Sequence, residues 1–136
     1  MQLSNQDLRG DKSMNLDAIT QQELPGHIMM YLVTGPITNY VADVLDFAMT
    51  GENNPNSLHL VNLAKATDIT DYGIQKLVLI QELLATKGHC WALTLDGTDN
   101  VLFEGIARGI KKKGVFIFKT REEAINYLLQ PTPATS

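Results

Sequence analysis

The sequence predicts a single α/β domain with a central mixed β-sheet and about four helices. Turn signals divide the chain into segments whose hydrophobic period alternates between that of a strand and that of a helix, in the order ββαβαβαβα. Strands that alternate with helices pair in parallel through crossovers, whereas the two consecutive strands at the start predict a hairpin. A chain of 136 residues with 44% hydrophobic residues can bury one core without disulfides or metals.

The helical segments are recognised by apolar residues at helical spacing, and the strands by short apolar runs between turns. Thr120 and Glu123 have the spacing of a capping box ahead of the last helix. Residues 1–13 and 131–136 are polar and aperiodic, so we expect flexible tails around a domain spanning 14–130. The expected elements are strands at 16–24 and 28–33, a helix from Thr38 to about residue 50, a strand at 57–63, a helix at 71–86, a strand at 90–95, a helix around 102–107, a strand at 115–118 and a helix that ends near Leu129.

Charge and composition exclude several classes of partner. The formal net charge of −4 argues against a nucleic-acid or anionic-membrane surface, so the expected partners are proteins or small ligands. No apolar run approaches the roughly 20 residues of a membrane-spanning helix, and the first residues lack the apolar segment of a secretory signal. We therefore expect a cytoplasmic protein without membrane insertion.

Neither catalysis nor a cofactor is predicted. His27, His59 and His89 are about thirty residues apart on separate elements and have no metal-ligand spacing, so no metal site is expected. His89 and Cys90 are neighbours, and neighbouring side chains of a strand point to opposite faces, which excludes a hydrogen-bonded dyad. Cys90, the only cysteine, is expected to be a small buried apolar residue.

The most informative stretch is LHLVNLAKATDITDYGIQKL, residues 58–77. It resembles the signature of STAS domains, in which a strand ends in Asp-Leu-Ser and, after a short loop, Asp-Ser-Ser-Gly-Leu opens the next helix. When Gly73 is aligned with the motif glycine, Asn62 takes the place of the strand aspartate without a gap. Thr70, Asp71 and Tyr72 then take the places of Asp-Ser-Ser.

Three further segments resemble the same family. VTGPIT is similar to the Gly-x-Leu-Asp that precedes the first helix, with Thr38 in the place of the aspartate. KGHCWALTL resembles the strand after the second helix, and FIFKTREEAINYLL resembles the final strand and helix. The likeness covers about residues 14–130 and implies the fold of bacterial anti-sigma factor antagonists.

The resemblance implies a partner-binding and regulatory surface formed by Thr38, Asn62, Thr67, Thr70, Asp71, Tyr72 and Gly73. In the family, the second serine of Asp-Ser-Ser-Gly is phosphorylated by an anti-sigma factor that is also a serine kinase. A hydroxyl at a helix N-terminus can hold an added phosphate because free N–H groups and the helix dipole favour the anion. Here Tyr72 stands in that place, so the phosphorylation site is degenerate.

Several alternatives stay open for these residues. Asp71 either mimics part of a phosphorylated state or only caps the helix, and Tyr72 is either an interface anchor or a surface residue. Thr67 and Thr70 remain as phosphorylation sites. The run at 111–113, three lysines, either meets an acidic partner or is a solvated helix end.

Three functions follow from these observations. The first is a regulatory binding module of the anti-sigma factor antagonist type. The second is a non-enzymatic accessory or scaffold subunit of a larger assembly, such as a lipid-exporting ABC transporter or a stress complex. Leu79 and Leu83 bear on both functions, because they either form an exposed apolar patch for a partner or are buried in a wide core face. The third is a small enzyme, which would need a polar pocket near Asn62, Thr70 and Asp71. Without a base or nucleophile partner in the sequence, these residues indicate at most ligand binding. A homodimer also stays open.

Overall fold

The computed structural model describes residues 18–51 and 56–130, which form a five-stranded mixed sheet and four helices. The order ββαβαβαβα is confirmed. The predicted tails at 1–13 and 131–136 lie outside the described residues, as do the first residues of the strand predicted at 16–24. The strands are β1 Ile19–Leu24, β2 Ile28–Ile37, β3 Leu58–Ile69, β4 Cys90–Thr94 and β5 Ile117–Phe118, and the helices are α2 Asn39–Thr50, α3 Asp71–Thr86, α4 Val101–Lys112 and α5 Arg121–Leu129.

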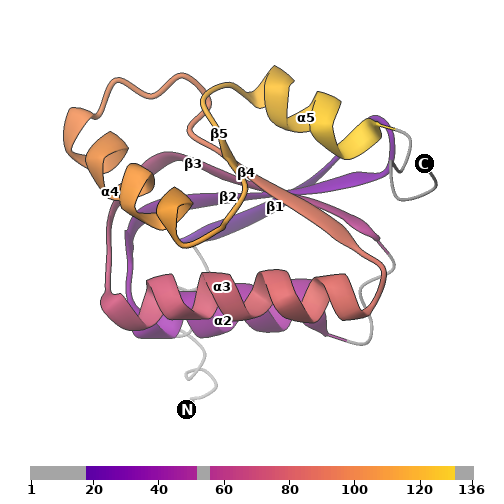
Figure 1. Cartoon of the computed structure of the whole chain (residues 1–136), viewed down its shortest axis with the longest axis horizontal. Helices are drawn as coiled ribbons and strands as arrows, with labels where there is room; N and C mark the ends of the chain where they lie inside the picture. The colour runs from indigo at the N-terminus through magenta and orange to yellow at the C-terminus, as the bar shows by residue number, and fades with distance from the viewer. Residues whose placement is uncertain (1–17, 52–55, 131–136) are drawn as a thin grey trace, which may run out of the picture.

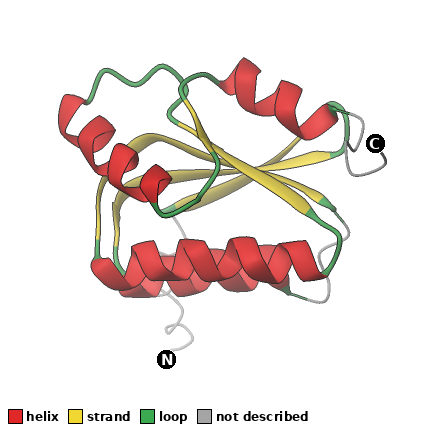
Figure 2. Cartoon of the chain, in the orientation of Figure 1, coloured by secondary structure: helices red, strands yellow, loops and turns green. Residues whose placement is uncertain are grey.

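The strands lie in the sheet in chain order, β1-β2-β3-β4-β5. β1 and β2 form the predicted antiparallel hairpin, and β2 to β5 run parallel. The parallel crossovers all step in the same direction, and right-handed crossovers of this kind place their helices on the same face. Accordingly α2, α3 and α4 pack on one face, while α5 covers the other (Figures 1 and 2).

The sheet separates two apolar clusters because successive side chains of a strand point to opposite faces. On the larger side, Val61 and Leu93 pack with Leu77 and other residues of the three crossover helices. On the smaller side, Leu60 and Ala92 pack with Ala124 and Leu128 of α5. The capping box predicted at Thr120 and Glu123 is present at the start of α5.

Two strand boundaries differ from the prediction, and both differences have one cause. β2 continues through Gly35 and Pro36 to Ile37, and β3 continues to Ile69 instead of ending at Leu63. The register shifts between Leu32 and Thr34 and again between Gly35 and Pro36, so β3 carries extra residues there. Bulges accommodate glycine and proline in a strand, which lets the two strands stay paired past these residues.

Other boundaries are corrected locally. Only Ile117–Phe118 of the strand predicted at 115–118 pairs with β4, and β4 ends at Thr94. Cys90 is exposed, so its predicted burial is wrong. It is the first residue of β4, whereas Ala92, two residues further on the same face, is covered by α5.

Leu77 and Leu79 of α3 offer a matched test of this packing. Leu77 is fully buried among the crossover helices, whereas Leu79 is 43% exposed on the same helix. Leu77→Ala is expected to lower the free energy of unfolding by about 2–5 kcal/mol because it removes buried methyl groups and leaves a cavity. Leu79→Ala is expected to lower it by about 0.5 kcal/mol or less.

Urea unfolding of both variants followed by circular dichroism measures the difference. Equal losses of stability in the two variants would contradict the orientation of α3.

Candidate functional site

The starts of α2 and α3 lie side by side at one edge of the sheet. The parallel pairing of β2 with β3 ends at Ile37 and Ile69, and the next residue of each strand, Thr38 and Thr70, is a helix N-cap in extended conformation. The Thr38 hydroxyl accepts a hydrogen bond from the N–H of Val41 at 3.2 Å. Each threonine thus satisfies an N–H group that its helix leaves free.

Thr70 also joins the two helix starts to each other. Its hydroxyl accepts from the N–H of Gly73 at 2.9 Å and donates to Asn39 Oδ1 at 2.7 Å, while its backbone N–H donates to the carbonyl of Ile37 at 3.2 Å. A side chain at Gly73 would place Cβ 2.8 Å from Ile69 Cγ1, so the motif glycine is required by close packing. The helix cap is therefore Thr70, and Asp71 lies exposed in the first turn.

Tyr72, in the first turn of α3, contacts α2 at this edge. Its hydroxyl donates to Asp43 Oδ1 at 2.5 Å. Lys76 Nζ lies 3.3 Å from Asp43 Oδ1, 3.4 Å from Asp46 Oδ2 and 5.3 Å from the centre of the Tyr72 ring. Tyr72, Asp43 and Lys76 thus form a triad in which a hydroxyl and an ammonium group share one carboxylate.

The pKa values of the triad reflect these contacts. The hydrogen bond from Tyr72, together with Lys76, holds the pKa of Asp43 below its ordinary value. The contact with Tyr72 and the carboxylates of Asp43 and Asp46 raises the pKa of Lys76 to about 12. Asp43 and Lys76 are therefore both charged at neutral pH.

Six of the seven residues singled out from the sequence lie at or next to this edge, and the seventh, Asn62, lies in a separate cluster. Thr67 is exposed at the end of β3, within the irregular part of its pairing with β2. Asn39, Asp43 and Lys76 were not singled out from the sequence. Asn39 and Asp43 lie four residues apart on one face of a predicted helix, and this polar stripe is the signal that could have indicated them. The six residues at the edge are Thr38, Thr67, Thr70, Asp71, Tyr72 and Gly73.

Asn62 is the seventh residue, and it lies in a separate polar cluster. Its side chain is almost fully buried, donates to Asp96 Oδ2 at 3.0 Å and accepts from the N–H of Ala64 at 2.9 Å. Arg121 at the start of α5 also donates to Asp96 Oδ2 at 3.0 Å. Although burial raises it, the hydrogen bonds from Arg121 and Asn62 lower the pKa of Asp96 overall, so this cluster holds a stable charge pair.

Large apolar side chains are exposed along α2 and α3 beyond the helix starts. Phe47 of α2 is 79% exposed, and Tyr40 lies nearer the start of the same helix with about half of its surface exposed. Leu79 and Leu83 are also exposed, as the first of the two alternatives predicted. Exposed apolar side chains that form one contiguous patch are typical of sites that bind other proteins.

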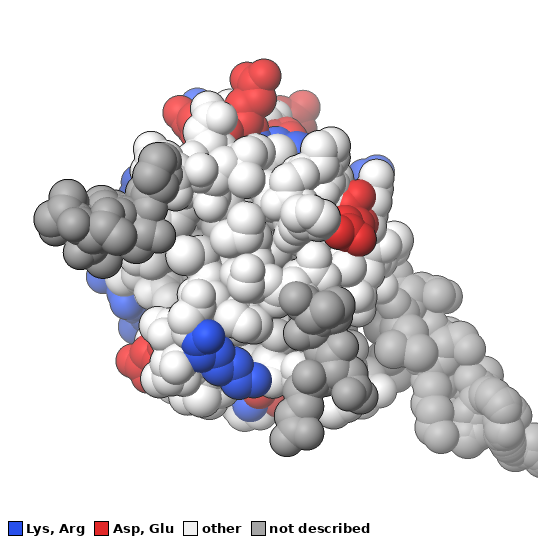
Figure 3. All heavy atoms as spheres, turned by 90° about the vertical axis from the view of Figure 1, so that its right-hand side faces the viewer, with Lys and Arg blue, Asp and Glu red and all other residues white. Residues whose placement is uncertain are grey.

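Two of the three histidines meet at the opposite edge of the sheet. His59 Nε2 lies 3.2 Å from His89 Nδ1, and His59 Nδ1 lies 3.1 Å from the hydroxyl of Tyr31. Burial, with the neighbouring His89 and Lys87, lowers the pKa of His59 to about 4, so its ring is neutral at pH 7. Figure 3 shows the side of the molecule that lies to the right in Figure 1, and the described residues at its centre include few charged side chains.

Within residues 18–51 and 56–130, no three His, Cys, Asp or Glu side chains are arranged to hold a metal ion. The two adjacent histidines are accounted for by their stacking and hydrogen bonds. None of the described helices combines the length and apolar character needed to cross a membrane.

Comparison with solved structures identifies the fold. The anti-sigma factor antagonist SpoIIAA in its unphosphorylated form superposes with a TM-score of 0.62 and 12% identity over 81% of this chain and 96% of that chain. The STAS domain of the SulP transporter from Vibrio cholerae gives 0.58 and 16% over 78% and 84%. A sulfate transporter family protein from Wolinella succinogenes gives 0.61 and 18% over 79% and 88%. The chain has the STAS fold, as its sequence predicted.

Searches of family models and of curated proteins found no match. The likeness therefore concerns the fold.

The Tyr72 to Asp43 hydrogen bond predicts a measurable change in acidity. Tyr72→Phe removes the hydroxyl and is expected to raise the pKa of Asp43 towards its ordinary value, because that bond favours the charged carboxylate. Tyr40→Phe is the matched control, since it alters an exposed tyrosine of α2. NMR titration of the Asp43 carboxyl carbon measures the effect, and an unchanged midpoint in Tyr72→Phe would contradict the contact.

His59 predicts a loss of stability at mildly acidic pH. Its pKa is about 4 in the folded protein and about 6.5 when unfolded, so between these values the unfolded chain binds more protons. The free energy of unfolding is expected to fall by up to about 3 kcal/mol as the pH drops through this window, with no contribution from His59 above it.

Urea titrations between pH 7 and pH 4 measure this slope. His59→Gln is expected to flatten it, whereas His27→Asn, which alters an exposed histidine, is expected to leave it unchanged. A wild-type slope that persists in His59→Gln would assign it to other groups.

Proposed function

We propose that this chain is a regulatory protein-binding module of the anti-sigma factor antagonist type, in which a fixed contact replaces phosphorylation. The STAS fold supports the proposal, and one of the similar structures is an anti-sigma factor antagonist. The observation that carries it is the position of Tyr72. By resemblance it occupies the place of the phosphorylated serine, and its hydroxyl is bound to Asp43.

The electrostatics at this position disfavour an added phosphate. A phosphate adds a charge of about −2 at pH 7, and the place nearest to the Tyr72 hydroxyl is taken by the Asp43 carboxylate. Lys76, the cation beside it, is already paired with Asp43 and Asp46. The helix dipole alone offers about 0.3–1 kcal/mol at an exposed site. Docking is therefore independent of a kinase.

The same reasoning applies to Thr70. Its hydroxyl caps α3 and donates to Asn39, so phosphorylation would remove the proton donated to Asn39 and crowd the cap at Gly73. Thr67 is exposed and has no such role, and it remains the phosphorylation site that the geometry permits.

The proposed docking surface is the helix-start surface, defined as residues 38–46 and 67–76. It offers the partner negative charge from Asp43, Asp68 and Asp71 and an aromatic side chain at Tyr72. We propose a partner with complementary basic and apolar groups, such as an anti-sigma factor related to serine kinases. A cytoplasmic, non-enzymatic role belongs to the same proposal.

A second candidate is favoured by the far ends of α2 and α3. Phe47, Leu79 and Leu83 are exposed there, and apolar side chains of this size are usually covered in a permanent assembly. Under this alternative the chain is an accessory or scaffold subunit, for example of a transporter. The likeness to the STAS domain of a SulP transporter supports it.

Affinity capture from lysate of the native cells tests the proposal with two matched charge reversals. Asp71 and Glu122 are both exposed acids in the first turn of a helix, α3 and α5 respectively. Asp71→Arg is expected to weaken partner binding by about tenfold or more, because a basic group on the partner meets a like charge. Glu122→Arg is expected to leave binding unchanged.

The two candidates differ in a further pair of variants. Tyr72→Ser restores the hydroxyl of the resembled motif, and a kinase-like partner is expected to phosphorylate this variant but not the wild type. Leu83→Gln is expected to affect binding only under the subunit alternative. Binding lost with Glu122→Arg but kept with Asp71→Arg would contradict the helix-start surface.

A further inference from the structure

The C-terminal part of α4 and the strand after it hold an excess of positive charge that the proposed function does not use. Residues 108–119 carry five of the 11 Lys and Arg residues of a chain with net charge −4, and they contain no acidic residue. Among the described residues, none of Arg108, Lys111 and Lys119 has an ion pair. A solvated helix end, one of the two alternatives, accounts for charge on a single face, but these three cations come from two separate segments.

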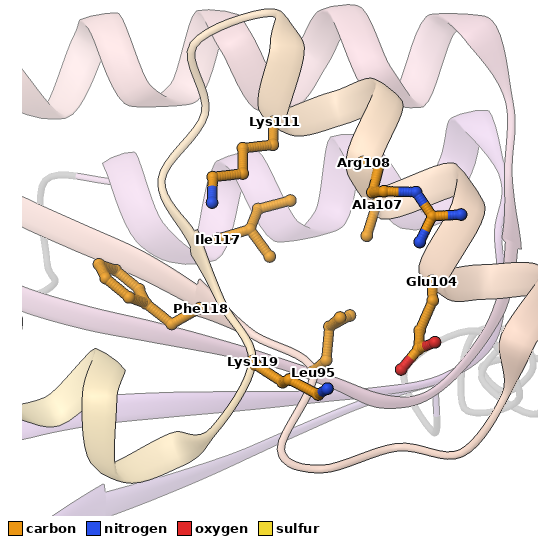
Figure 4. Close-up of a pocket in the computed structure, with 8 residues that line it drawn as sticks. All are labelled: Leu95, Glu104, Ala107, Arg108, Lys111, Ile117, Phe118 and Lys119. Atoms are coloured by element: carbon orange, nitrogen blue, oxygen red, sulfur yellow. The ribbon is translucent and has the colours of Figure 1, made fainter.

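These three cations surround a pocket of about 210 Å³ between α4 and the ends of β4 and β5 (Figure 4). Arg108 and Lys111 extend from α4, and Lys119 follows β5 on the other side of the pocket (Figure 4). Its apolar lining includes Leu95 and Ile117, which are nearly buried. Crevices beside the carboxyl ends of parallel strands are frequent ligand sites in α/β folds.

We propose that this pocket binds a small organic anion, a carboxylate or phosphate carried on a compact apolar body. Guanidinium and ammonium groups at the rim match the oxygens of such an anion, and desolvated apolar walls match its body. The volume lies below the roughly 300–1,000 Å³ of pockets for drug-sized ligands, which selects a ligand of about the size of a substituted benzene. Glu104 is the one acidic group of the lining, so the three cations outweigh it, which matches an anion of one or two negative charges.

The test uses benzoate and phenyl phosphate as probes, with benzamide as the uncharged match. Amide NMR spectra of the isotope-labelled full chain are recorded as each probe is added up to about 10 mM, which detects millimolar affinity. Benzoate or phenyl phosphate is expected to shift the signals of residues 95, 104–111 and 117–119, and benzamide is expected to shift them at least about tenfold more weakly.

Variants separate a built pocket from diffuse attraction. Arg108→Gln and Lys119→Gln are expected to weaken probe binding by about tenfold each, since each removes a charge that lines the pocket. Lys113→Gln removes a charge from the same basic run outside the pocket, and it is expected to weaken binding by less than about twofold. The wild type and the three variants are first compared by circular dichroism, so that a folding defect is separated from a loss of binding.

Three results would overturn the proposal. They are an absence of shifts at the pocket residues with either anion, equal binding of benzamide and benzoate, and an equal loss of binding in Lys113→Gln and Arg108→Gln. The last result would mean that the lysines at 111–113 and Arg108 attract a polyanionic partner through their summed charge, without a specific pocket. Because none of these variants lies on the helix-start surface, the outcome is independent of the proposed docking function.

Discussion

The long parallel pairing of β2 with β3 determines where the starts of α2 and α3, the proposed docking surface, lie. It continues past Gly35 and Pro36 to Ile37 and Ile69, so both strands end together and both following threonines cap a helix. The two helices therefore start side by side, and the side chains of their first turns lie at the same edge of the sheet. Without the bulges that keep this register, Thr70 could not donate to Asn39, nor Tyr72 to Asp43. The helix-start surface is thus a consequence of strand register.

The sequence predicted the order of elements because hydrophobic period and turn residues are local signals, and α3 and the capping box at Thr120 were confirmed from them. The ends of β2 and β3 were missed because a bulge depends on the partner strand, which local sequence does not reveal. The contacts of the site depend on the same long-range information. Tyr72 and Asp43 are 29 residues apart, and His59 and His89 are 30 apart. Each of these separations along the sequence is about the length of one crossover. A crossover brings residues of neighbouring strands or helices together.

Charge is distributed over three separate places in this fold. The helix-start surface joins Asp43 and Lys76 to an aromatic hydroxyl, the cluster of Asn62 and Asp96 ties the sheet to α5, and the pocket beside α4 gathers unpaired cations. The second place accounts for Asn62, which lies away from the helix starts. Asn62 has taken a structural role, since an uncharged amide can both donate to Asp96 and accept from the backbone in a nearly buried position.

We propose that a protein partner docks on the helix starts without a phosphate switch. Amide hydrogen exchange of the unphosphorylated chain, free and in complex with its captured partner, tests it most directly. On binding, we expect slower exchange at residues 38–46 and 67–76, with α5 unchanged. Protection confined to α5 or β1, or binding that appears only after phosphorylation, would contradict it.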